Sequence, residues 1–306
     1  MTNAGIPAKS RPATDAANVA RSAAVLMVLP KRRRQWAQSA LVSVAAAVLA
    51  LILSAAMFPW AFTTYEPNAM DLMATLQPPS FEHLFGTDAL GRDILCRSIY
   101  GAQISIFVAA CAVFVAGAVG TALGILAAYF RGPTDAIIMR LADVQFSLPA
   151  VILAMFLVGA IGASILNLII VLTLANWARF ARVIRSEALS LRTRDFVLLA
   201  ELAGASPLRV MVRHIAPNIL SSLIVLATLD VGVIVILEAT LSSLGLGIRP
   251  PDPSLGTLIA DGRGYLATAW WISVLPGLVL MSLILACNTL GDYLRDRLSP
   301  TLAMKW

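Results

Sequence analysis

Charged side chains are scarce in this chain. Of its 306 residues only 13% are Asp, Glu, Lys or Arg, whereas 59% are hydrophobic, and a typical soluble domain is about 25% charged. Four stretches, residues 35–65, 98–130, 144–178 and 264–291, contain no charged residue. A helix that crosses a bilayer needs about 20 apolar residues. These absences exclude a soluble globular protein and predict an all-α polytopic membrane protein.

Residues that carry bond chemistry are also few. The two histidines, His83 and His214, are far apart, and the three cysteines have no metal-ligand spacing. The chain has no Gly-x-x-x-x-Gly-Lys-Ser/Thr phosphate loop. We therefore expect no catalytic residue, no metal site and no cofactor in this chain, which is not expected to be an enzyme.

The apolar runs predict six transmembrane helices. The run 144–178 decides the number, because a single helix of that length would be about 50 Å long, whereas the hydrocarbon core is about 30 Å thick. We divide it at the Gly-rich turn 159–164. The expected spans are 37–60, 103–129, 145–162, 165–183, 218–243 and 268–290.

The placement of positive charge predicts the orientation. With six helices, 19 of the 23 Lys and Arg residues lie on the side of both termini, including those of the loops 131–140 and 179–213. The positive-inside rule makes that side cytoplasmic. We expect a disordered N-terminal tail (1–35), a transmembrane domain (36–298) and a cytoplasmic C-terminal tail (299–306).

A long polar segment, residues 186–217, separates the fourth and fifth predicted spans. Its apolar residues recur at helical spacing, Gly204 can end a helix, and Ser206 and Pro207 are a favourable N-cap and first helical residue. The pattern predicts two helices joined by a sharp bend at the membrane surface, in which Gly204 sets the bend. An interfacial amphipathic helix that only anchors the bundle remains an alternative.

The same segment carries a resemblance. The stretches 194–197, 200–206 and 213–218 are similar to the EAA loop of ATP-binding-cassette importer permeases, in which a coupling helix sits in a cleft of a cytoplasmic ATPase. Residues 85–93 and 238–247 resemble further motifs of the second permease of dipeptide, oligopeptide and nickel importers. The resemblance covers residues 36–300 in collinear order.

The resemblance implies a type I ABC importer permease fold in the bacterial inner membrane. It implies four kinds of partner: a homologous second permease, cytoplasmic ATP-binding subunits that bind ATP and Mg, an extracytoplasmic substrate-binding protein, and membrane lipid, with no nucleic acid. The implied solutes are di- or oligopeptides, or nickel complexes. The implied coupling-loop residues are Asp195, Ala200, Glu201, Gly204, Ala205, Ser206 and Pro217.

One position departs from the family pattern. Where the family has the glutamate of Glu-Ala-Ala, this chain has Leu198, and Glu201 follows about one helical turn later. Either Asp195 or Glu201 could offer a carboxylate to the ATPase. Alternatively, the contact rests on shape and apolar packing.

Five charged residues outside the loop are further candidates. Asp230 and Glu238 lie in the fifth span, where an acidic residue indicates a role in the translocation path or a hydrogen bond between helices. Asp88, Arg92 and Asp93 lie outside the membrane in the predicted topology. They could form salt bridges that shape an extracytoplasmic cap or contact the binding protein, and the two roles are compatible.

A self-sufficient secondary transporter is the main rival function. It would need ion-coupling carboxylates in pairs and inverted repeats with broken helices, and the sequence shows neither. A membrane scaffold without transport activity is the second rival.

Overall fold

The computed structural model describes residues 31–298, and every regular element in that part of the chain is helical. The chain divides into two compact units, with the boundary between Val44 and Ala45. The first 14 described residues therefore belong to the first unit and the rest to the second. The long helices are α2 (Lys31–Met57), α3 (Ile94–Phe130), α4 (Gly132–Phe146), α5 (Ala150–Ile161), α6 (Ile165–Arg192), α9 (Ala216–Ser243) and α11 (Trp271–Leu298). The short ones are η1 (Pro59–Ala61), α7 (Asp195–Leu202), α8 (Pro207–Arg209), η2 (Val210–Ile215), α10 (Leu255–Asp261) and η3 (Gly262–Tyr265).

The predicted spans correspond to these helices. Five helices of the described part are long and apolar enough to cross a membrane, and there are six candidates if the bent pair α4–α5 is counted as one broken span. Helix α2 begins at Lys31, so residues 31–35 of the predicted tail are helical. Residues 1–30 and the C-terminal tail, 299–306, lie outside the described residues.

The third span differs from its prediction. Instead of one helix over 145–162 after a loop at 131–140, the chain forms α4 and α5, which meet at an angle of 93°. Pro149 explains the break, because proline disfavours the helical conformation of the residue before it. Residues 132–140, which were predicted to lie in a polar loop, thus belong to helix α4.

The fourth helix is longer than predicted. It was expected to end near residue 183, but α6 continues to Arg192. Its arginines pair with carboxylates of α4: Arg182 Nη2 lies 2.5 Å from Asp143 Oδ1, and Arg185 donates two hydrogen bonds to Asp135. Most of the arginines assigned to a loop thus lie on a helix, and two of them hold α4 against α6.

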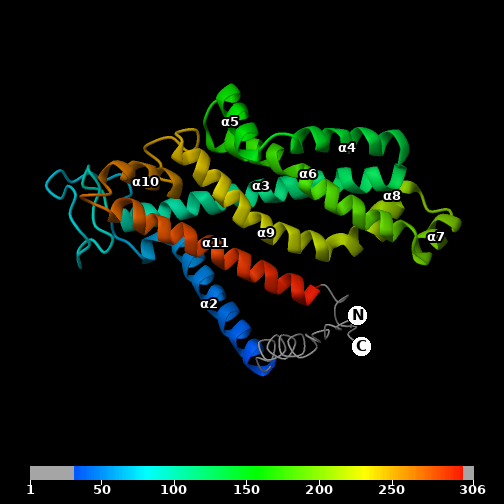
Figure 1. The fold of residues 1–306 in the computed structure, drawn as a ribbon, viewed down its shortest axis with the longest axis horizontal. Helices are drawn as coiled ribbons and strands as arrows, with labels where there is room; N and C mark the ends of the chain where they lie inside the picture. Colours follow the sequence, from blue (N-terminus) through cyan, green and yellow to red (C-terminus); the bar gives the residue numbers. More distant parts are fainter. Residues whose placement is uncertain (1–30, 299–306) are drawn as a thin grey trace, which may run out of the picture. The chain divides into compact units, whose positions relative to one another are not determined.

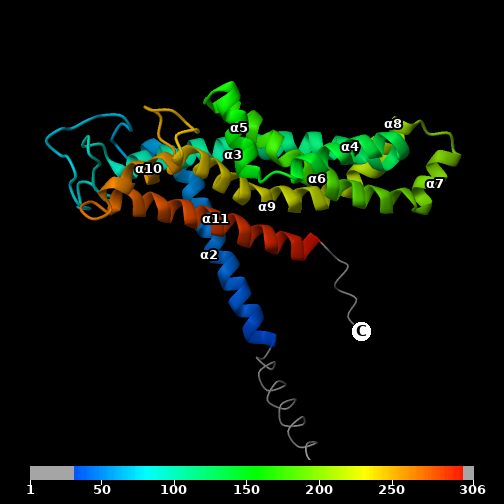
Figure 2. The same ribbon diagram turned by 45° about the horizontal axis from the view of Figure 1, so that its top comes forward.

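Helices α3, α6 and α9 run side by side, and α11 follows α9 (Figures 1 and 2). Small residues permit the close contact of α3 with α6. A Cβ added at Gly120 would lie 2.5 Å from both Phe180 Cβ and Trp177 O, and one at Gly124 would lie 2.6 Å from Ala181 O. The main core fills the space between these helices with Val, Leu, Ile and Ala side chains.

Candidate functional site: the coupling segment and the membrane ion pair

The coupling segment, residues 193–217, lies at the end of the helix bundle opposite α10 (Figure 1). Helix α7 ends in a Schellman motif, because Ala205 N donates to Ala200 O and Gly204 N donates to Glu201 O, each at 3.0 Å. Gly204 has φ +79°, in the left-handed region, and no described atom lies within 4 Å of a Cβ added there. Its role is conformational, since space is not limiting.

The chain then turns into the fifth span. Ser206 is the N-cap and Pro207 the first residue of α8, as predicted, although the Ser206 side chain makes no capping hydrogen bond among the described residues. Residues 210–215 form a π-helix, η2, directly before Pro217. Proline removes an N–H donor and its ring clashes with the carbonyl four residues earlier, so a wider turn is favoured at this place. Helices α8, η2 and α9 form one continuous element, Pro207–Ser243.

One face of α7 anchors the segment to the bundle. Val197 is fully buried in a second apolar cluster with Ile184, Val210 and Ile215. The Glu201 carboxylate lies within interaction range of the Tyr129 hydroxyl of α3. Val197 therefore holds α7 against α6 and η2.

The other face of α7 is apolar and exposed. Leu202 is 84% exposed and Leu199 63%, although both are side chains that normally bury. Phe196, Leu198 and Leu208 are exposed around them, and so is Asp195. Glu201 lies near Tyr129, whereas the Asp195 side chain is exposed and has no hydrogen-bond or ion-pair partner among the described residues. We call the five apolar residues the α7 surface: Phe196, Leu198, Leu199, Leu202 and Leu208.

The fifth span contains a buried carboxylate that pairs with the fourth. Asp230 is fully buried, and its Oδ1 lies 2.5 Å from Arg179 Nη1, whose side chain is 42% exposed. The second oxygen, Oδ2, has no hydrogen-bond partner among the described residues. Arg179 was not among the predicted site residues, because the prediction placed it in a loop. The spacing Arg179, Arg182, Arg185 was the available signal, because residues three apart share a helix face.

Glu238 has a different environment. Its carboxylate is fully buried and accepts hydrogen bonds from Ser105 of α3 and from Ser242, both at 2.7 Å. The structure thus shows that the Glu238 carboxylate links α3 to α9 by hydrogen bonds and does not pair with Arg179.

The three charged residues expected in the extracytoplasmic cap lie together before α3. Asp93 caps α3 by accepting from Cys96 N at 2.7 Å, and its other oxygen lies 2.9 Å from His83 Nδ1. Asp88 pairs with Arg92 at 2.6 Å. All three residues shape the turn that leads into the helix, which leaves their predicted contact with a binding protein open.

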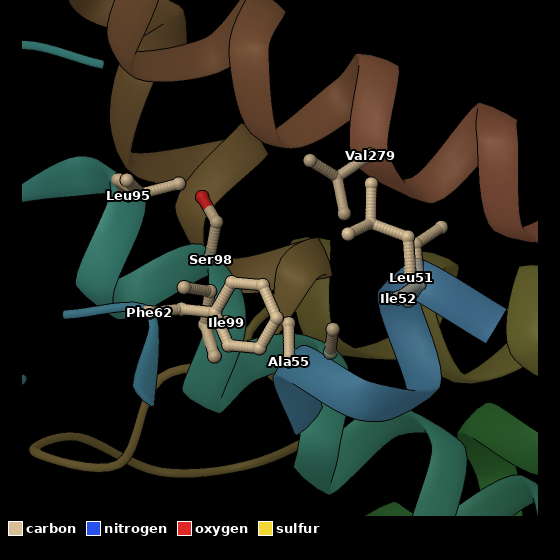
Figure 3. Close-up of a pocket in the computed structure, with 9 residues that line it drawn as sticks. Leu51, Ile52, Ala55, Phe62, Leu95, Ser98, Ile99 and Val279 are labelled. Atoms are coloured by element: carbon tan, nitrogen blue, oxygen red, sulfur yellow. The ribbon is translucent and has the colours of Figure 1, made fainter. Parts of the chain in front are cut away.

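A separate apolar pocket of about 190 Å³ lies between α2, α3 and α11 (Figure 3). Its lining is aliphatic and aromatic except for Ser98, whose hydroxyl donates to Ile94 O of its own helix. Such a lining offers no partner for a charged or peptide group. Among the described residues, no group of three or more His, Cys, Asp and Glu side chains could hold a metal ion.

Comparison with known proteins decides the family. Residues 120–303 match the model of the binding-protein-dependent transport system inner membrane component. The chain belongs to this family. It is 43% identical, over 84% of its length and 86% of the relative's, to a peptide transport system permease protein of Brucella abortus biovar 1. It is 38% identical to the dipeptide transport system permease protein DppC of Haemophilus influenzae (78% of this chain, 83% of the relative). It is also 38% identical to the glutathione transport system permease protein GsiD of Escherichia coli O6:K15:H31 (89% and 88%).

Membership confirms the predicted family, permease function, helical fold and inner-membrane location. The chain is a multi-pass permease subunit of a transport system, and the secondary-transporter reading is not supported. Permeases of this family are not catalytic themselves.

Proposed function

We propose that this chain forms half of the translocation path of an ATP-driven importer and that the α7 surface docks on a cytoplasmic ATPase. The carrying observation is a group of exposed apolar side chains on a short helix that is rigidly attached to two membrane helices. Exposed apolar patches of this kind mark interaction sites. The basic residues near α7 make this end cytoplasmic by the positive-inside rule.

The attachment of α7 suits it to transmit motion. Helix α6 leads into the segment and the continuous element Pro207–Ser243 leads out, so displacement of α7 would move both spans. The burial of Val197 in the second apolar cluster, against which Tyr129 also packs, holds α7 to the bundle. Alternating access needs such an element with two arrangements, biased by a ligand or motor.

Because Leu198 stands where the family has glutamate, we propose that docking here rests on apolar packing. Asp195 is the carboxylate left available on this surface. The partners that complete the importer are a second permease, ATPase subunits and an extracytoplasmic binding protein. The curated relatives suggest a solute of the peptide class, such as a dipeptide.

Within the membrane, we propose that the Arg179–Asp230 pair lines the path. The observation that supports this role is the exposed half of Arg179, because a lipid-facing arginine in a span is costly. Glu238 is assigned to packing, since both of its oxygens accept hydrogen bonds from serines.

Photocrosslinking tests the docking. A photoreactive amino acid at Leu202, in native membranes, should crosslink to an ATPase subunit, and the same group at the buried Val197 should not. The substitution Leu199→Gln should weaken binding-protein-stimulated ATP hydrolysis, because it places a polar group in a contact that excludes water. Crosslinks from Leu202 to lipid alone would support the interfacial-anchor alternative and contradict the proposal.

A further inference from the structure

A charged cavity of about 500 Å³ lies at the α10 end of the bundle. The end of α9, helix α10, their connecting loop and the turn before α3 form its walls. Its volume falls within the range of about 300–1,000 Å³ that is typical of small-molecule sites. Five charged residues line it: Arg92, Arg97, Arg249, Asp252 and Asp261.

Arg97 is the unusual member of this lining. It is only 3% exposed, and its Nη1 donates to Pro67 O at 3.0 Å, yet Nε has no hydrogen-bond partner among the described residues. Arg92 differs because it is paired with Asp88. A buried guanidinium with an unsatisfied donor is costly unless an acceptor completes it. The Nε itself is closed off from solvent, so it is as part of the cavity lining that the Arg97 guanidinium offers positive charge to a solute.

The other charges complete the chemistry. Arg249 is exposed at the rim and forms no ion pair within the described part of the chain. The Asp261 side chain is exposed and lines the same cavity as Arg92 and Arg97; partial desolvation raises its pKa, and the two arginines act in the opposite direction. Asp252 lies on the loop before α10. The cavity thus offers guanidinium groups for an anion and carboxylates for a cation.

We propose that this cavity binds a zwitterionic solute, with Arg97 and Arg249 on its carboxylate and Asp252 and Asp261 on its ammonium group. Guanidinium is the preferred partner of a carboxylate because its planar fork matches the two oxygens. The inference rests on the proposed function, since a peptide with free ends is such a zwitterion. The cavity would be the first site that the solute meets in this subunit.

A protein side chain fits the cavity less well than a solute. A single acidic side chain of a docked protein would satisfy the arginines, but it would face two aspartates, and like charges repel. A solute that carries both signs has a partner for each group. The volume also exceeds what one side chain needs.

The test uses the assembled complex of both permeases and the ATPases in lipid nanodiscs, without the binding protein. Saturation-transfer NMR measures contact with three probes: dialanine, its C-terminal amide and its N-acetyl derivative. We expect transfer to dialanine and about tenfold weaker transfer to the other two, because each lacks one charged hydrogen-bonding end. An excess of dialanine should abolish the remaining signal of the amide and of the N-acetyl derivative, because all three probes compete for one site.

Variants locate the site. Arg249→Gln, at the exposed rim, should reduce transfer to dialanine about tenfold, and Arg97→Lys should weaken it while keeping a positive charge. Arg263→Gln is the matched control, since this exposed arginine of η3 does not line the cavity. It should leave the signal unchanged.

Three NMR results would overturn the inference: no transfer to dialanine in the unaltered complex, equal transfer to dialanine and its amide, or loss of the signal in all three variants alike. A result that combines two assays would also overturn it. In that case Arg249→Gln would leave the dialanine signal unchanged but would raise the binding-protein concentration needed for half-maximal ATP hydrolysis. That outcome would show that the cavity docks a protein. The proposed function is judged separately, because stimulation of ATP hydrolysis by the binding protein does not depend on the NMR signal.

Discussion

Replacement of Gly204 separates backbone conformation from bulk. This residue has φ +79° and an open surrounding, since no described atom lies within 4 Å of an added Cβ. A left-handed conformation costs an ordinary L-residue about 1–2 kcal/mol, whereas asparagine adopts it more readily. Asparagine and leucine side chains have the same branching and four heavy atoms each, so Gly204→Asn and Gly204→Leu both add bulk, but they differ in this conformational cost and in polarity.

We expect Gly204→Leu to lower the population of the docking conformation by a factor of about 5–30, which corresponds to about 1–2 kcal/mol. Gly204→Asn should remain within about threefold of the unaltered protein. The assay is binding-protein-stimulated ATP hydrolysis by the reconstituted importer, at limiting ATPase concentration. Equal impairment by both variants would show that bulk against the ATPase matters, and equal activity of both would refute a role for the bend.

Two further substitutions test the membrane part. Gly120→Ala should destabilise the bundle by about 1–3 kcal/mol, because its Cβ would overpack the contact of α3 with α6. Gly159→Ala is the control, since no described atom lies within 4 Å of its Cβ, and it should not destabilise the bundle. Equal melting temperatures of the two variants in detergent would contradict this prediction. Arg179→Met should cost up to about 3–5 kcal/mol by leaving Asp230 buried and unpaired, and less to the extent that the 42% exposure of Arg179 already solvates the pair. Adding Asp230→Asn should restore part of the loss, and a double variant no more stable than Arg179→Met would show that the pair is not what matters.

The number of spans and the bend at Gly204 could be predicted from the sequence. Charge-free runs define spans because every charge in a bilayer is costly, and glycine followed by serine and proline specifies a turn by local backbone preference. These signals are local, so they need no knowledge of the tertiary structure. The end of α7 and the start of α8 accordingly match their predictions.

Pairings between distant residues could not be predicted. Arg182 and Arg185 of α6 pair with Asp143 and Asp135 of α4, which lie 39 and 50 residues earlier in the chain. Likewise, the local sequence shows no sign that Glu201 lies near Tyr129 of α3, 72 residues earlier in the chain. A carboxylate on a short helix has the same local pattern whether it faces a partner or its own bundle.

Copurification shows which proteins this permease assembles with. The tagged chain is extracted from native membranes in a mild detergent, and mass spectrometry identifies the proteins that accompany it. The account predicts a second permease of the same family together with ATPase subunits, and it predicts that Gly204→Leu loses the ATPases but keeps the second permease. Repeated recovery of the chain alone, with crosslinking applied before extraction, would contradict it.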